Sequence, residues 1–237
     1  MKRRVSTSGG CIAYEVIRTV QGKAQVCALP GGQVRLYAPA GFSLRDADAL
    51  VTENADALRM RLTLLDGPQC TPGCLPIEGK PHPVRILQGA PAAEVMQGEV
   101  RITLPDPQDL SAVRAALNGL LHDLARKRIA ERLAHWHARI GGAYTAVCIG
   151  DLGVKWGACS RDAALAFSPL LILAQPEALD YVVIHELCHL HEFSDSARFW
   201  KLVRAQQAEC DIWKTWLKTH KQELMTCVDN WMREYAE

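Results

Sequence analysis

Residues 185–189 read His-Glu-Leu-Cys-His and hold three side chains that together could carry out hydrolysis. Residues four apart in an α-helix lie on one face, so His185 and His189 would present two imidazole nitrogens to one metal ion. Glu186 would stay free to take a proton from a metal-bound water and pass it to the leaving group. This division of roles is that of a zinc hydrolase, although a pattern of three fixed residues needs support from its surroundings.

A catalytic zinc site needs a third protein ligand and an open position. Glu192 follows His189 by three residues but would lie about 10 Å along the helix axis from His185, which is awkward for a shared ion. His191 would point away from the shared face. Asp195 comes after the expected helix end, where the chain can fold back, and its carboxylate is an ordinary zinc ligand. Its alternative role is to cap the next helix. We expect zinc to be held by His185, His189 and Asp195.

The elements that must position these residues follow from the hydrophobic pattern. Pro176 opens a helix that contains the motif in an apolar run, Tyr-Val-Val-Ile-His-Glu-Leu-Cys-His-Leu. Residues 194–196, Ser-Asp-Ser, interrupt this helix and can cap another that runs to about residue 217. Residues 143–150, 152–160 and 163–169 are expected to be strands. A long amphipathic helix is expected from about residue 107 to the glycine pair at 141–142.

The first hundred residues are expected to be rich in strands. Segments 11–20, 24–28, 33–39, 82–89 and 98–105 have strand composition, and segment 44–63 has a helical period. No internal repeat is apparent. Cys70 and Cys74 form a lone Cys-x3-Cys pair, which is a weak signal for a structural metal because no second pair accompanies it.

Composition excludes few classes of function. Hydrophobic residues make up 49% and charged residues 22%, and the net charge of +1 does not indicate nucleic acid as a partner. Arg126, Arg128 and Arg132 on the long helix could still contact phosphate. No apolar run reaches membrane-spanning length and the basic N-terminus lacks the apolar stretch of a secretory signal. The nine cysteines are scattered, so we expect reduced thiols and a cytoplasmic location without membrane contact.

The segment 156–200 resembles the YgjP-like metal-dependent hydrolases, which are related to SprT-like and WLM metallopeptidases. That family has an Arg-Trp-Gly-Ser-Cys strand, a His-Glu-Leu-x-His-Leu helix and an Asn-His-Ser-x-x-Phe-Trp segment. The matching residues here are Trp156, Gly157 and Cys159, then Pro176, Tyr181, His185, Glu186, Leu187, His189 and Leu190, then Ser196, Phe199 and Trp200.

We expect an α+β fold with three parts, and the resemblance covers most of the chain but not the last 18 or so residues. A β-rich N-terminal region would span residues 1–106, and a zincin-like hydrolase domain with its HExxH helix and small sheet would span residues 107–219. A helical tail would span residues 220–237. One departure from the family matters: Asp195 stands where the family usually has a histidine. It implies a more negative site and a weaker Lewis acid, so another divalent metal is possible, as is a site that no longer turns over.

The expected function is that of a zinc-dependent metallopeptidase, in which a zinc-bound water activated by Glu186 attacks a peptide carbonyl. The residues expected to contact substrate are Lys155, Trp156, Gly157, Arg198 and Trp200. The strand 152–160 could also hold substrate by strand addition. One alternative is a metal-dependent nucleotide hydrolase that binds a phosphoanhydride through Lys155, Arg161, Arg198 and Lys201. Another is a non-catalytic, zinc-bearing module that binds nucleic acid or protein.

Overall fold

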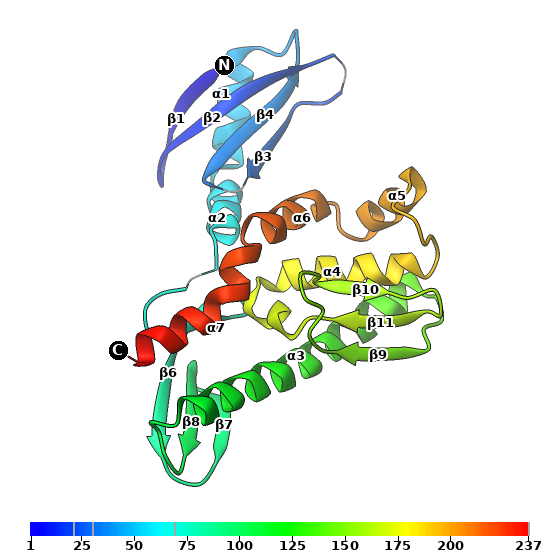
Figure 1. Ribbon diagram of the computed structural model, residues 1–237. Helices are drawn as coiled ribbons and strands as arrows, with labels where there is room; N and C mark the ends of the chain where they lie inside the picture. Colours follow the sequence, from blue (N-terminus) through cyan, green and yellow to red (C-terminus); the bar gives the residue numbers. More distant parts are fainter. Residues whose placement is uncertain (21, 30, 69, 237) are drawn as a thin grey trace. The chain divides into compact units, whose positions relative to one another are not determined.

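The computed structural model describes residues 1–20, 22–29, 31–68 and 70–236, and they form two compact units, Met1–Gly67 and Pro68–Glu237 (Figure 1). Both units combine helices with small sheets, so the α+β class expected from the sequence is confirmed. The expected domain boundaries at residues 106/107 and 219/220 both lie inside the second unit and stay predictions. Among the described residues, no helix has both the length and the apolar character needed to cross a membrane.

The first unit is a four-stranded sheet with two helices on one face. Its strands are β1 (Lys2–Thr7), β2 (Gly10–Thr19), β3 (Gln25–Leu29) and β4 (Gln33–Pro39), in the order β1-β2-β4-β3. Strands β2 and β4 are parallel and the other pairs are antiparallel. Successive side chains of β2 and β4 point to opposite faces of the sheet, and one face is buried. The buried residues on it are Ile12, Tyr14, Val16, Val34, Leu36 and Ala38.

The helices of the first unit are α1 (Leu44–Glu53) and α2 (Ala55–Leu65), where the sequence predicted a single helix over residues 44–63. Ser43 starts α1 by accepting a hydrogen bond from the Asp46 backbone N–H. The division occurs at Asn54, whose side-chain amide donates to the Leu50 carbonyl. Such a local bond competes with the helical ladder, so the prediction of one uninterrupted helix was wrong.

The second unit begins with another four-stranded sheet followed by a long helix. Its strands are β5 (Cys74–Ile77), β6 (Lys80–Gln88), β7 (Ala92–Met96) and β8 (Glu99–Leu104), in the order β5-β6-β8-β7. The helix is α3 (Leu110–Ile140), which starts at the N-cap Asp109 and ends at Gly141 with a φ of 73°. The glycine pair therefore ends the helix as predicted.

The two units share one module, and this internal repeat was not predicted from the sequence. In each unit, the first two strands form an antiparallel hairpin and the next two strands form another. The last strand of the second hairpin then pairs in parallel with the last strand of the first, and a helix follows. The registers also correspond: Glu15 lies opposite Arg35 across β2 and β4, and Arg85 lies opposite Arg101 across β6 and β8. The sequences keep only a trace of the repeat, in Val34-Arg35 of β4 and Val100-Arg101 of β8, which stand at the same register positions.

The rest of the second unit builds the region around the His-Glu-Leu-Cys-His motif (Figure 1). A three-stranded sheet has the order β10-β11-β9, with β9 (Ala146–Ile149), β10 (Gly157–Cys159) and β11 (Ala164–Phe167). A 3-10 helix, η1 (Pro169–Leu173), leads to α4 (Pro176–His189), which carries the motif. The helices α5 (Ala197–Gln206), α6 (Cys210–Thr219) and α7 (Lys221–Ala236) follow.

Helix α4 is buried on most of its sides, which explains why its sequence is apolar throughout rather than striped. It packs against α3, α5, α6, η1 and β10. Its buried side chains are Ala178, Leu179, Tyr181, Val182, Val183, Ile184, Glu186, Leu187 and Cys188. A helix held from several directions fixes the motif residues in place.

Candidate metal centre

Two imidazoles and one carboxylate converge at the C-terminal end of α4. His185 Nε2 lies 3.1 Å from His189 Nε2, and His189 Nε2 lies 3.6 Å from Asp195 Oδ1. One donor atom from each of the three residues lies within 4.8 Å of the other two. A tetrahedral zinc ion with ligand bonds of about 2.0–2.1 Å holds its donors about 3.3 Å apart. The predicted triad thus fits a zinc ion, and no other such group occurs in the described part of the chain.

Asp195 is free to face the histidines because another residue caps α5. The Ser196 hydroxyl accepts a hydrogen bond of 3.2 Å from the Phe199 backbone N–H. The alternative role that the sequence allowed for Asp195, helix capping, therefore falls to its neighbour. The Asp195 side chain remains 61% exposed, so this side of the site is open to solvent.

The two imidazoles are held in different ways. His189 Nδ1 lies 3.2 Å from the Glu192 carbonyl oxygen, which fixes the ring with its Nε2 toward His185. The Phe199 ring packs on both imidazoles, with centroid distances of 4.8 Å to His185 and 4.3 Å to His189. Burial, with smaller effects from His189 and Lys214, lowers the pKa of His185 to about 4. His185 is therefore neutral near pH 7, which is the form that binds a metal.

The Glu186 side chain follows His185 on α4 and packs against β10. It is 5% exposed, and a Cβ atom built on Gly157 would lie 2.6 Å from its Oε1. Glycine at position 157 therefore leaves room for the carboxylate beside the strand. Burial raises the pKa of Glu186 to about 8; the negative charge of Asp195 adds to this, and the positive charge of Lys155 opposes it. A carboxylate with a raised pKa can both accept and return a proton near neutral pH.

The residues predicted to contact substrate lie on two sides of this centre. Gly157 contacts the Glu186 carboxylate, and Lys155 is exposed in the turn before β10. The Trp200 ring lies 5.7 Å from the His185 ring, and the Lys214 ammonium lies 3.9 Å from the Trp200 centroid. Their roles stay predictions, as do those of Trp156, which is half-buried, and Arg198, which is exposed in the first turn of α5.

A cavity of about 440 Å³ adjoins His189 of this centre, and it was not predicted from the sequence. Cys159 and Arg161 line it from the end of β10 and the turn after it, and His189, His191 and Phe193 line it from the end of α4. These two segments are about thirty residues apart, and no spacing rule connects them. Of this set, Arg161 was considered from the sequence for phosphate binding in the nucleotide alternative, and His191 as a candidate to stabilise an oxyanion.

Cys70 and Cys74, the weak metal signal, do not form a metal site in the structure. The Cys70 thiol instead lies 3.3 Å from the thiol of Cys227 on α7. The contact connects the segment before β5 with the C-terminal helix of the same unit. The tail helix is also held by Arg114, whose guanidinium lies 2.5 Å from the Asp229 carboxylate.

Comparison with known proteins gives one match. The family model described as YgjP-like, metallopeptidase domain, matches residues 23–220, which include β3 to α6 and all three residues of the triad. No curated protein and no solved structure matches the chain.

Proposed function

The chain belongs to the YgjP-like family, which makes it a metal-dependent hydrolase of the peptidase type, and on this premise we propose that it is a zinc peptidase. The observation that carries the proposal is the convergence of His185, His189 and Asp195 within 4.8 Å, one residue away from a buried glutamate. The donor set of two nitrogens and one carboxylate oxygen is that of catalytic zinc sites.

Each residue of the site has a distinct task in this proposal. Zinc held by the triad would polarise the substrate carbonyl and make a water molecule a nucleophile at neutral pH. Glu186 accepts the proton from the attacking water and then donates it to the nitrogen of the leaving amine. The buried position of Glu186 keeps its carboxylate basic, since burial disfavours the charged form.

Strand β10 offers a place for the substrate backbone. It is the last strand of its sheet and pairs only with β11 among the described strands, so one side of its backbone is available. An extended peptide added along that side would run past Gly157 and therefore past the base. The cavity beside His189 would take one side chain of that peptide.

A second candidate function is the hydrolysis of a nucleotide phosphoanhydride. The observation that favours it is the exposed Arg161 on the wall of the cavity next to His189. No ion pair or hydrogen bond of its side chain occurs within the described residues, so its guanidinium could bind a phosphate. The same metal centre would serve both reactions, and only the substrate would differ.

The test compares the zinc-loaded protein with its Glu186→Gln variant on two substrate pools. One pool is an unfolded protein and peptide mixture, and the other is a panel of nucleoside triphosphates. Glu94→Gln is the matched control, because this substitution also replaces a carboxylate by an amide, at a residue that is exposed on β7. New amino termini that disappear in Glu186→Gln, and not in the control, support the peptidase.

The remaining outcomes separate the alternatives. Phosphate or pyrophosphate release that depends on Glu186 supports the nucleotide hydrolase instead. Equal activity in wild type and Glu186→Gln contradicts the assignment of the base. A zinc-loaded protein that is silent on both pools contradicts both proposals and favours a non-catalytic, zinc-bearing module.

A further inference from the structure

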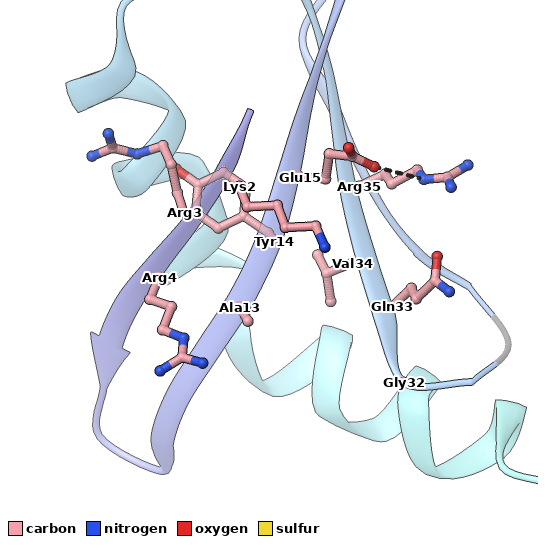
Figure 2. Close-up of a pocket in the computed structure, with 10 residues that line it drawn as sticks. All are labelled: Lys2, Arg3, Arg4, Ala13, Tyr14, Glu15, Gly32, Gln33, Val34 and Arg35. Atoms are coloured by element: carbon pink, nitrogen blue, oxygen red, sulfur yellow. Dashed lines mark ion pairs between the residues drawn. The ribbon is translucent and has the colours of Figure 1, made fainter.

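The first unit has an open sheet face, which we define as the side of β1, β2 and β4 that carries Lys2, Arg4, Ala13, Glu15, Gln33 and Arg35 (Figure 2). It forms a cavity of about 850 Å³. Arg3 and Tyr14 alternate with these residues along the strands and point to the helical side, where both donate to the Asp48 carboxylate. The helices thus cover one face of the sheet, and the open sheet face has side chains of different chemistry.

Positive charge exceeds negative charge on the open sheet face. Arg35 Nε lies 3.4 Å from Glu15 Oε2, the pair that is marked in Figure 2. Lys2 and Arg4 are exposed and have no ion-pair or hydrogen-bond partner for their side chains within the described residues. The open sheet face therefore carries three cations and one carboxylate, and the two cations without a partner, Lys2 and Arg4, are available to a ligand.

The second copy of the module provides an internal comparison. On the corresponding face, Arg85 and Arg101 lie beside Glu94 and Glu99, which gives two charges of each sign. Glu99 pairs with both arginines there, and Arg101 Nε lies 2.9 Å from its Oε2. The module therefore folds without an excess of positive charge, and the excess on the open sheet face is not a requirement of the fold.

The basic run on α3, which the sequence offered as a phosphate-binding cluster, is largely neutralised. Arg132 makes two hydrogen bonds of 2.6 and 2.7 Å to Asp180. Arg128 pairs with Glu78 at 2.5 Å and with Glu131 at 3.2 Å. Arginines that already have carboxylate partners gain less from a phosphate, so the nucleic-acid contact considered there is better placed on the open sheet face.

We propose that the open sheet face binds single-stranded nucleic acid. Lys2 and Arg4 are two residues apart on one strand, about 7 Å, and Arg35 is two strands away, about 10 Å. Cations spread in this way fit several phosphates of one chain better than a single small anion. Ala13 between them is small and leaves the floor flat, so that a base can lie on the sheet beside the Gln33 amide.

The width of the sheet favours binding of a single strand over binding in the major groove of a duplex. Four strands span about 14 Å, whereas the major groove of B-DNA is about 12 Å wide and admits a helix or a two-stranded ribbon. The open sheet face cannot enter that groove to contact base edges. A single strand can lie across it with phosphates on Lys2 and Arg4.

The test measures fluorescence anisotropy of a labelled twenty-nucleotide single strand with the full chain over a range of salt concentrations. Each phosphate contact on a single strand contributes about 0.7 to the slope of log K against log salt. The double variant Lys2→Gln/Arg4→Gln should therefore lower that slope by about 1.4 and weaken binding. Arg85→Gln/Arg101→Gln removes the same charge from the balanced face and should change neither quantity. Both side chains of the first variant are exposed, so its thermal unfolding should match the wild type.

Four results would contradict the proposal. The first is no binding of the wild-type chain at low salt, and the second is an equal loss in both double variants. The third is a poly-glutamate peptide that competes as well as the oligonucleotide, which would identify an acidic polypeptide as the partner. A duplex of the same length that binds as tightly as the single strand would contradict the single-strand assignment.

Discussion

A methyl group added at Gly157 should disable the proposed base and leave the metal ligands undisturbed. The Cβ of Gly157→Ala would lie 2.6 Å from Glu186 Oε1 and 2.8 Å from both Glu186 Cγ and Val182 Cγ1. The carboxylate must retreat by about 0.8 Å to restore ordinary van der Waals contact. Val182 cannot simply turn away, because β-branched side chains are stiff at χ1 in a helix. The φ of Gly157 is not positive, so the backbone itself tolerates alanine.

The expected loss follows from the size of this displacement. A misplacement of about 1 Å in an active site can cost about 10²-fold in rate, which corresponds to about 2.7 kcal/mol in the activation barrier. Zinc affinity should stay within a few-fold, because the donor atoms of His185, His189 and Asp195 are not among the atoms that the new methyl group would meet. The signature is therefore a loss of kcat in a protein that still binds zinc.

The assay follows the release of amino termini from an unfolded protein substrate, with zinc titrated in parallel. Gly150→Ala is the control, because a Cβ there meets nothing within 4 Å and its φ is not positive either. A folded, zinc-loaded Gly157→Ala protein with the wild-type rate would refute the role given to Glu186 at this position. A loss of zinc together with activity would show that the strand supports the ligands and not the base.

Asp195→Ala should weaken zinc binding by at least about 10²-fold, since even the loss of an outer-shell partner can cost that much, whereas Asp195→His should retain zinc. Competition with a chromogenic chelator measures both affinities, and a wild-type affinity in the alanine variant would contradict Asp195 as a ligand. Diamide should oxidise Cys70 and Cys227 to a disulfide, because the two thiols give two electrons and two protons to the diazene. A disulfide between residues 157 apart should raise the free energy of unfolding by about 5 kcal/mol in the chain-entropy model. Peptide mapping should find that bond and Cys70→Ser should lack both the bond and the higher Tm; a Tm that does not change on oxidation would show that the closed geometry is strained. The Arg3 guanidinium, and to a smaller extent the Tyr14 hydroxyl, hold the pKa of Asp48 below its usual range. The Asp48 carboxylate therefore stabilises the fold at a pH above its usual pKa, and this stabilisation is lost as the pH falls through its lowered pKa. Asp48→Asn should flatten this acid limb in urea unfolding, and an unchanged limb would contradict the assignment.

The convergence of His185, His189 and Asp195 could be predicted from the sequence because local geometry determines most of it. The spacing of His185 and His189 on a helix fixes their common face. Asp195 needed one further fact, which residue caps α5, and only the structure shows that Ser196 does. The contact between Gly157 and Glu186 depends on how β10 packs against α4, and no local pattern specifies that packing.

The strands that the sequence did not predict are β1, β5 and β7, and each lies at the edge of a four-stranded sheet. An edge strand pairs on one side only and can carry charges, as β1 does in Lys-Arg-Arg-Val-Ser-Thr. Its strand conformation depends on the neighbour rather than on its own composition. The repeat was not predicted because few side chains apart from Val34-Arg35 and Val100-Arg101 are common to both copies, whereas the pairing of strands is.

The repeated module also has a consequence for how the chain folds. Tandem copies of one structure can exchange strands while they fold, and the products are misassembled proteins. If β6 took the place of β2 beside β4, Arg85 would stand where Glu15 stands, next to Arg35. Gln33 occupies the position that Glu99 has in the second copy, so no carboxylate from β4 would separate the two guanidinium groups. Repulsion at this one pair position therefore opposes the exchanged sheet and helps each hairpin to find its own partner strand.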